Sequence, residues 1–309
     1  MELFLGVDGG QSGTKALIGD PDGRVIGEGR GGPCNHAAAA EGREKLVRAV
    51  GEAVGGACAQ ANLDAAAVRF AAACLGMSGG PADKEDILRR ILRADHLAVT
   101  DDAVIALAGA TAGEPGIITI AGTGSIAFGR NTQGRTARVG GWGYIFGDEG
   151  AAFDIVRQAL RAALRMEEGW GPGTALREAL LRAAGNANAN QVLHLFYTPD
   201  WPRSRVATLA PLVDELARNG DPVAADILRN AAQQLALLAA SVRRQLWQPG
   251  DAARVSWTGG VFRSPLVLER FRYLVELEDG NVARPPEHGP AAGALIEAYR
   301  LAGIRPWLR

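Results

Sequence analysis

Residues 3–19 read LFLGVDGGQSGTKALIG. Two short apolar runs, each typical of a buried strand, flank a loop that is rich in glycine and hydroxyl side chains. The turn signal Asp20-Pro-Asp-Gly23 and a third strand-like run over 24–29 follow. The stretch therefore predicts an antiparallel meander of three strands, with a glycine-rich loop between the first two.

Helix and strand patterns alternate after this meander. Apolar residues at helical spacing predict helices over 41–60, 83–92 and 103–112, and short apolar runs predict strands over 68–75 and 97–100. The first part of the chain thus has the order βββαβαβα. The same order begins again at residue 116, where strands over 116–121 and 126–130 flank Gly122-Thr-Gly-Ser125.

The second part carries a longer helical region. Its predicted elements are helices over 148–165, 224–246, 266–277 and 289–302 and strands over 254–258 and 282–284, with a broken helical insertion over 169–222. We expect a first lobe over 1–114 and a second over 115–289, with the helix at 290–309 packing back on the first. A duplicated α/β domain leaves an interlobe cleft, where ligands prefer to bind.

Composition narrows the function classes. The 309 residues are 47% hydrophobic and 22% charged, with a net charge of −1, which indicates a globular chain long enough for two domains. No basic patch predicts nucleic-acid binding, and no apolar run is long enough for a membrane span or a signal peptide. The cysteines Cys34, Cys58 and Cys74 form no CxxC pair, which fits a reducing cytoplasm. Whether the chain is a monomer or a homodimer is left open.

Two glycine-rich hairpins predict a phosphate site. The loop Asp8-Gly-Gly-Gln-Ser-Gly-Thr-Lys15 follows the first strand, and Gly122-Thr-Gly-Ser125 holds the equivalent place in the second half. Glycines let the backbone approach an anion and direct N–H groups at it, and hydroxyl side chains add donors. Asp8 would repel phosphate unless a cation lay between them, so it is interpreted as a Mg²⁺ ligand, direct or through water. Either loop alone is equally compatible with a plain hairpin turn.

Two further strand ends carry candidate residues. Thr258-Gly-Gly-Val-Phe262 can let a flat ring or its ribose pack on the backbone, or it can be a simple strand–helix turn. Asp101 and Asp102 end the last strand of the first lobe, where a carboxylate can take a proton from an attacking hydroxyl. One of the two can instead cap the helix that follows.

The stretch 140–150, GGWGYIFGDEG, is too rich in glycine and aromatic residues for an ordinary helix or strand. Asp148 or Glu149 can accept sugar hydroxyls and Trp142 can offer a stacking face. Alternatively, the carboxylates only favour the dipole of the helix that follows. On the first lobe, Asn35 and Ser78 are expected to line the cleft.

With these motifs together, the chain resembles the eukaryotic-type N-acetylglucosamine kinases, within the BadF/BadG/BcrA/BcrD ATPase family of the actin-like (actin/hexokinase/Hsp70) ATPase superfamily. The resemblance runs over nearly the full length and implies an α/β fold of two RNase H-like lobes. It is carried by Gly6-Val-Asp-Gly-Gly10, Asn35-His36, Ser78-Gly-Gly80, Asp102-Ala103, Gly122-Thr-Gly-Ser125, Gly140-Gly-Trp-Gly143 and Gly147-Asp-Glu-Gly150.

The resemblance implies that MgATP phosphorylates the 6-hydroxyl of an amino sugar, preferably N-acetylglucosamine. Asp102 would be the catalytic base, because it fits the family's spacing to the Gly122 loop, with Asp101 as the fallback. The sugar would be held by Asn35, Ser78, Gly124, Ser125, Trp142 and Asp148. ATP would be held by Gly9, Gly10, Gln11, Ser12, Thr14, Gly122, Thr123, Gly259 and Gly260.

The sequence departs from the family pattern at Gln11-Ser12-Gly13, where sugar kinases usually have Gly-Thr, and at Val139, where some members carry a cysteine. Glucosamine and N-acetylmuramic acid therefore stay open as alternative substrates. Two other functions are alternatives: a non-catalytic sugar-binding regulator, which is a different class of protein, and, from another branch of the same family, an ATPase that activates a dehydratase through an iron–sulfur cluster. The latter needs clustered cysteine thiolates, which the three scattered cysteines do not provide.

Overall fold

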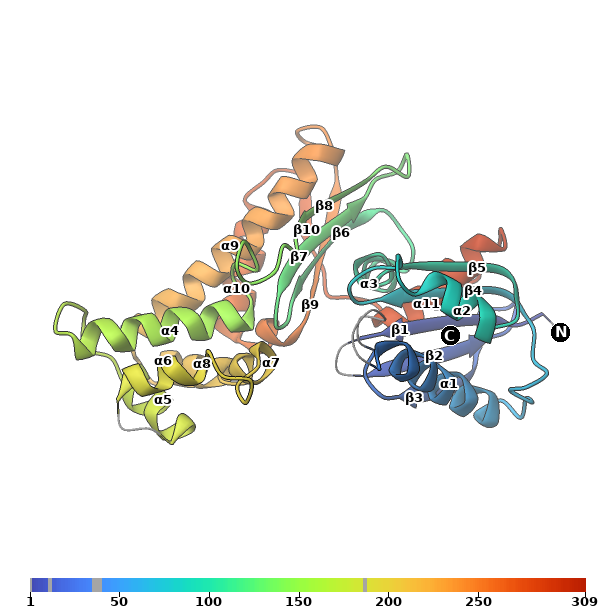
Figure 1. Ribbon diagram of the computed structural model, residues 1–309. Helices are drawn as coiled ribbons and strands as arrows, with labels where there is room; N and C mark the ends of the chain where they lie inside the picture. The colour runs from blue at the N-terminus through green and yellow to red at the C-terminus, as the bar shows by residue number, and fades with distance from the viewer. Residues whose placement is uncertain (1, 11–12, 35–40, 186–187) are drawn as a thin grey trace. The chain divides into compact units, whose positions relative to one another are not determined.

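A computed structural model describes residues 2–10, 13–34, 41–185 and 188–309. The chain forms two compact units (Figure 1). Unit 1 comprises Met1–Pro115 together with Pro285–Arg309, and unit 2 comprises Gly116–Arg284. Each unit contains one five-stranded sheet and the helices that cover it.

Unit 1 is built on a sheet with the strand order β3-β2-β1-β4-β5. Its elements are β1 (Phe4–Gly9), β2 (Thr14–Gly19), β3 (Val25–Gly31), α1 (Gly42–Gln60), β4 (Phe70–Met77), α2 (Glu85–Ile91), β5 (Ala94–Asp101), α3 (Asp102–Ala110) and α11 (Pro290–Leu301). The first three strands are antiparallel, and β4 and β5 run parallel to β1. The carboxyl ends of β1, β4 and β5 therefore lie at one edge of the sheet.

Two hydrophobic cores hold unit 1 together. Strand residues such as Val7 and Leu75 pack with Leu46 and Val50 of α1 on one side of the sheet. Phe4 and other strand residues pack with Leu295 and the rest of α11 in a second cluster. The helix α11 thus packs against a sheet whose first strand lies almost 300 residues earlier in the chain. In Figure 1 it is the red helix beside the blue strands.

Unit 2 is built on a sheet with the order β10-β9-β6-β7-β8. Its elements are β6 (Gly116–Ala121), β7 (Ser125–Arg130), β8 (Thr136–Gly140), α4 (Ala152–Glu167), α5 (Leu176–Ala184), α6 (Ala189–Leu195), α7 (Arg203–Ala207), α8 (Ala210–Arg218), α9 (Pro222–Leu246), β9 (Ala253–Thr258), the 3₁₀ turn η1 (Gly260–Arg263), α10 (Pro265–Glu276) and β10 (Asn281–Ala283). One core cluster joins the sheet to these helices.

The two sheets have the same topology. In each, three antiparallel strands form a meander, and two further strands run parallel to the first strand of that meander. The predicted order βββαβαβα and its repetition are therefore confirmed. Two local predictions were wrong: the strand β8 was not expected, and α4 begins at Ala152 instead of Asp148.

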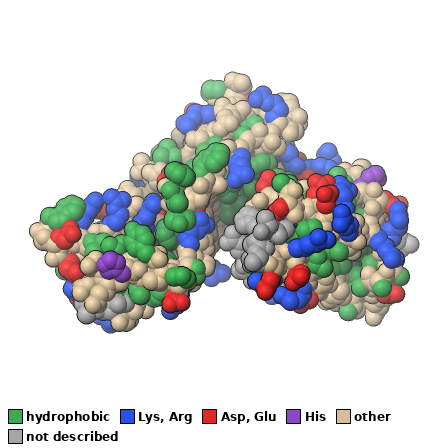
Figure 2. All heavy atoms as spheres, viewed as in Figure 1, with side chains coloured by type: hydrophobic (Ala, Val, Ile, Leu, Met, Phe, Trp, Pro, Cys, Tyr) green, Lys and Arg blue, Asp and Glu red, His purple; other side chains and the backbone are tan. Residues whose placement is uncertain are grey.

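Surface composition agrees with the near-zero net charge. Acidic and basic side chains lie interspersed over the visible face of unit 1 (Figure 2). Among the described residues, no helix combines the length and the apolar character that crossing a bilayer requires.

Candidate active site

Unit 1 brings Asp8, Ser78 and Asp102 to one edge of its sheet. In the parallel register Asp8 of β1 lies beside Gly76 of β4, and Gly76 lies beside Thr100 of β5. Ser78 and Asp102 follow directly after their strands. Because parallel strands end at the same edge, residues far apart in the sequence meet there.

Asp102 and Ser78 are joined by a hydrogen bond. The Ser78 hydroxyl donates to Asp102 Oδ2 at 2.8 Å, and the Ser78 N–H donates to the Gly9 carbonyl at 3.0 Å. Asp101 occupies the N-cap position of α3 without a side-chain capping bond. A carboxylate oxygen of Asp101 lies instead against Gly80, 3.3 Å from where a Cβ would stand. Of the two predicted bases, Asp102 is therefore the one directed at the cluster.

Asp8 is placed in an unusual electrostatic environment. Its pKa is raised to about 6, mainly by burial and also by the neighbouring Asp102, while Lys15 lowers it. Lys15 itself pairs with Glu28 at 3.1 Å. Two carboxylates close together at a strand edge provide a place where a cation is favoured.

This pKa predicts how stability varies with pH. The pKa of Asp8 is higher in the folded state than the ordinary value of 3.8, so between about pH 4 and pH 6 the folded protein binds a proton that the unfolded chain has lost. Stability therefore falls as the pH rises through this range. The loss is at most about 3 kcal/mol for a shift of this size. We expect Asp8→Asn to remove this loss. Urea unfolding of both proteins at pH 4 and pH 7, with a chelator present, measures it, and an identical pH dependence in both would contradict it.

The glycine-rich loop of unit 1 is only partly described. The Gly10 N–H donates to the Gly13 carbonyl at 3.0 Å, so this donor closes the turn. Thr14 is buried, its hydroxyl donates to the Gly32 carbonyl at 2.8 Å, and its Oγ1 lies 2.9 Å from Cys34 Sγ. The Thr14 hydroxyl thus ties β2 to the chain that follows β3. Gln11, Ser12 and Asn35 lie outside the described residues.

The equivalent turn of unit 2 is tied to the loop that precedes α4. The Ser125 N–H donates to Asp148 Oδ1 at 3.1 Å, and its hydroxyl donates to the Glu149 carbonyl at 2.7 Å. A Cβ on Gly124 would lie 2.8 Å from both Asp148 oxygens, so only glycine fits beside this carboxylate. Gly122 N–H closes the turn by donating to the Gly124 carbonyl at 3.0 Å.

These contacts place two of the predicted sugar-binding residues. Ser125 is buried, and its N–H and its hydroxyl both donate within unit 2, so it holds the turn against the loop 140–150. Asp148 is only 4% exposed, and its φ of 62° lies in the left-handed region, which explains why α4 cannot begin there. Glu149, by contrast, is exposed.

The loop 140–150 has an anchored base and an open tip. Asp154 accepts from the Gly150 N–H at 3.0 Å and pairs with Arg157 at 2.6 Å, and Arg157 donates to the Tyr144 carbonyl at 3.2 Å. Trp142 is 76% exposed, so its ring face is open for stacking.

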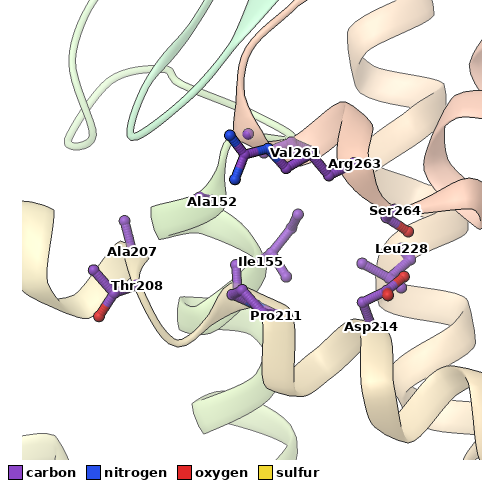
Figure 3. Close-up of a pocket in the computed structure, with 12 residues that line it drawn as sticks. Ala152, Ile155, Ala207, Thr208, Pro211, Asp214, Leu228, Val261, Arg263 and Ser264 are labelled. Carbon is purple, nitrogen blue, oxygen red and sulfur yellow. The ribbon is translucent and has the colours of Figure 1, made fainter.

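A cavity of about 300 Å³ lies in unit 2 (Figure 3). Its lining is mostly apolar and comes from α4, α7, α8, α9 and η1. The lining residues are Ala152, Ile155, Ala207, Thr208, Ala210, Pro211, Asp214, Leu228, Gly260, Val261, Arg263 and Ser264. Ala152 connects the cavity to the turn, because its N–H donates to the Gly122 carbonyl at 2.9 Å. A mostly apolar, partly open pocket of this size suits a flat ring.

The two glycines after β9 have different roles. Gly260 lines the cavity. Gly259 has a φ of 109°, and a Cβ there would overlap the Ala121 carbonyl of β6, so close backbone packing requires glycine at this position. Sequence reasoning missed Pro211, Asp214 and Arg263, because the helical segment that supplies the first two carries no recognisable motif.

The cysteines lie inside unit 1. Cys34, Cys58 and Cys74 are buried free thiols. Burial raises the pKa of each, and that of Cys74 reaches about 12. Protonated, buried thiols are poor ligands for an iron–sulfur cluster.

The model of the BadF/BadG/BcrA/BcrD ATPase family matches residues 5–298. The chain belongs to this family. The match spans both units, and with them both glycine-rich hairpins and the Asp8–Ser78–Asp102 cluster. The family resemblance expected from the motifs is therefore confirmed.

Relatives within the BadF/BadG/BcrA/BcrD family include proteins that act on amino sugars. An N-acetylmuramic acid/N-acetylglucosamine kinase of Clostridium acetobutylicum is 33% identical over 90% of this chain and 91% of its own length. An N-acetyl-D-glucosamine kinase of Dictyostelium discoideum is 31% identical over 79% of this chain and 80% of its own. The structure of a candidate N-acetylglucosamine kinase from Chromobacterium violaceum superposes with a TM-score of 0.78 at 28% identity, covering 98% of this chain and 99% of that one. The predicted two-lobed α/β fold is confirmed by this likeness.

Proposed function

We propose that this protein is an ATP-dependent amino-sugar kinase that transfers the γ-phosphoryl group of ATP to the 6-hydroxyl of N-acetylglucosamine. The observation that carries the proposal is the carboxylate of Asp102, oriented by the Ser78 hydroxyl at a strand edge of an ATPase-family chain. The two kinases named above as relatives, each more than 30% identical, support the choice of an amino sugar.

In this proposal Asp102 takes the proton from the attacking sugar hydroxyl. Phosphoryl transfer needs mainly positioning and charge stabilisation, so one correctly placed acceptor is enough. Ser78 fixes the direction of the carboxylate through the bond to Oδ2. Asp102 is also the first residue of α3. The start of this helix fixes its backbone, and the bond from Ser78 fixes its carboxylate.

The residues of unit 1 fit a magnesium ion. Among the described residues no three His, Cys, Asp or Glu side chains form a metal site on their own. Mg²⁺ does not need one, since it usually takes one or two carboxylates and completes its shell with phosphate oxygens and water. Asp8, whose burial and proximity to Asp102 make its negative charge costly, is the residue we propose to hold it. The ion would neutralise charge on the transferring phosphoryl group.

We propose that unit 2 binds the nucleotide. The adenine ring would occupy the apolar cavity beside Gly260. Ala152 lines this cavity and also donates to the Gly122 carbonyl, so the phosphate chain would extend past Ala152 to the backbone of Gly122 and Thr123. Backbone groups of such turns are suited to anions. The Gly9–Gly10 loop of unit 1 is also proposed to contact ATP phosphates. ATP use and protonated free thiols both suit a cytoplasmic enzyme.

A second substrate deserves equal testing. The relative from Clostridium acetobutylicum is named for N-acetylmuramic acid as well as N-acetylglucosamine. A coupled ADP-release assay with N-acetylglucosamine, N-acetylmuramic acid, glucosamine, N-acetylmannosamine and glucose decides between them. We expect the highest kcat/KM for N-acetylglucosamine. The absence of sugar-dependent ADP release with every sugar would reject the kinase and favour a non-catalytic sugar-binding protein.

Filling the cavity should weaken ATP binding specifically. Ala207 lies at the cavity wall and is nearly buried (Figure 3). We expect Ala207→Phe to raise the KM for ATP by about tenfold or more, because losing the contacts of a buried ring costs upwards of about 1.4 kcal/mol. The KM for the sugar serves as the internal control and should change less than about threefold. Equal changes in both KM values would indicate general damage to unit 2.

A further inference from the structure

Arg203 connects the helical part of unit 2 to the loop 140–150. It is the first residue of α7, in a segment that carries no recognisable motif. Its Nη1 lies 3.2 Å from Asp148 Oδ2, and its guanidinium lies over the Tyr144 ring, 5.6 Å from the ring centre. One side chain thus contacts the loop at two points that are four residues apart.

The Asp148 carboxylate depends on such a contact. It is 4% exposed, and its Oδ1 already accepts from the Ser125 N–H. Within the described part of the chain Oδ2 is buried and receives no hydrogen bond, although Arg203 lies next to it. A buried carboxylate is costly unless a charge compensates it. Arg203 supplies that charge.

Three other charged residues border the loop, and Arg138 among them donates to the Gly141 carbonyl at 3.4 Å. Arg157 is paired with Asp154 at 2.6 Å on α4. Glu149, the next residue in the chain, carries the same sign as Asp148. Removing Arg203 would therefore leave the buried Asp148 carboxylate without a compensating charge, because Glu149 is acidic and Arg157 is already paired with Asp154.

We propose that Arg203 is a positioning residue for the amino sugar. By holding Asp148 and Tyr144 it keeps the loop 140–150, with Trp142 at its tip, in the conformation that binds the sugar. The helical segment would thereby contribute to sugar recognition without touching the sugar. This inference rests on the proposed kinase function, because the loop is assigned to the sugar there.

Steady-state kinetics of Arg203→Met test the proposal. The KM for N-acetylglucosamine should rise about tenfold or more, the scale of losing one charge-assisted contact. The KM for ATP and kcat should change less than about threefold, because Arg203 does not line the nucleotide cavity. Arg203→Lys should recover most of the loss, since it keeps the charge.

Arg205→Met is a matched control on the same short helix. Arg205 lies over the Trp201 ring at 4.5 Å and donates to the Asp200 carbonyl at 2.8 Å. Its loss should leave the sugar KM unchanged. A rise in sugar KM equal to that of Arg203→Met, or no recovery with lysine, would overturn the proposal in favour of general stabilisation of α7.

A double-mutant cycle with Asp148→Asn separates coupling from general damage. If Arg203 acts through Asp148, adding Arg203→Met to Asp148→Asn should cost much less than Arg203→Met alone, whereas additive effects would overturn the proposal. Hydrogen exchange of the peptide 141–150 needs no activity. Faster exchange in Arg203→Met, but not in Arg205→Met, is expected, and unchanged exchange counts against the inference even if the wild type phosphorylates none of the sugars and the kinase proposal itself fails.

Discussion

Replacing Asp102 by Asn is expected to lower kcat by a factor of about 10² to 10⁴, the usual contribution of a general base. Asparagine keeps the shape of the side chain and can still accept the hydrogen bond that Ser78 donates at 2.8 Å. It cannot take a proton. Sugar binding, measured by calorimetry, should therefore change little while turnover is lost.

Asp101→Asn is the matched control for this experiment. Asp101 precedes Asp102 in the chain, and asparagine serves as well as aspartate at the N-cap of α3. Its carboxylate lies against Gly80 instead of accepting from Ser78. We expect turnover within about threefold of the wild type. Loss of turnover in Asp101→Asn together with an active Asp102→Asn would assign the base to Asp101.

The doubled order of strands and helices could be predicted because it depends on local patterns. Apolar runs such as 3–7 and 116–121, ended by glycines, determine where strands stop and turns begin. The strand β8 was missed because it is short and half exposed, so Thr136–Gly140 offers no continuous apolar run. Its place in the sheet comes from pairing with β7, which local sequence does not encode.

The predicted start of α4 was wrong for a different reason. Acidic residues at 148 and 149 look like a helix N-terminus, but Asp148 adopts a φ of 62° and turns toward Ser125. That contact joins residues 23 positions apart in the chain. A tertiary hydrogen bond of this kind overrides a helix-start pattern, and no local pattern reports it.

In the candidate site, too, local patterns could be predicted and tertiary contacts could not. The glycine-rich turns and the acids at strand ends were visible in the sequence, because parallel strands bring their carboxyl ends together. Which of Asp101 and Asp102 is directed at the cluster depends on Ser78, 24 residues away from Asp102. Pro211 and Arg263 line the same cavity because of how the helices pack around it. Ser125 and Thr14 have the residue types that bind ligands, yet packing commits their hydroxyls to backbone carbonyls.

Replacing Gly259 by Ala is expected to destabilise the protein by about 3–5 kcal/mol, the sum of backbone strain and overpacking. Gly259 has a φ of 109°, which L side chains rarely adopt, and a Cβ would overlap the Ala121 carbonyl at the end of β6. The backbone of Ala121 cannot yield without moving the adjoining Gly122 turn. Nucleotide binding should therefore weaken along with stability.

Gly260→Ala is the control, because among the described residues no heavy atom lies within 4 Å of a Cβ at that position and its φ is ordinary. Urea unfolding at neutral pH should give Gly260→Ala a free energy of unfolding within about 1 kcal/mol of the wild type. The difference between the two neighbouring variants isolates the contact with Ala121. Equal stability of the two would mean that β6 and the β9 turn can separate, and that close packing of the backbone at Ala121 does not fix the position of the Gly122 turn.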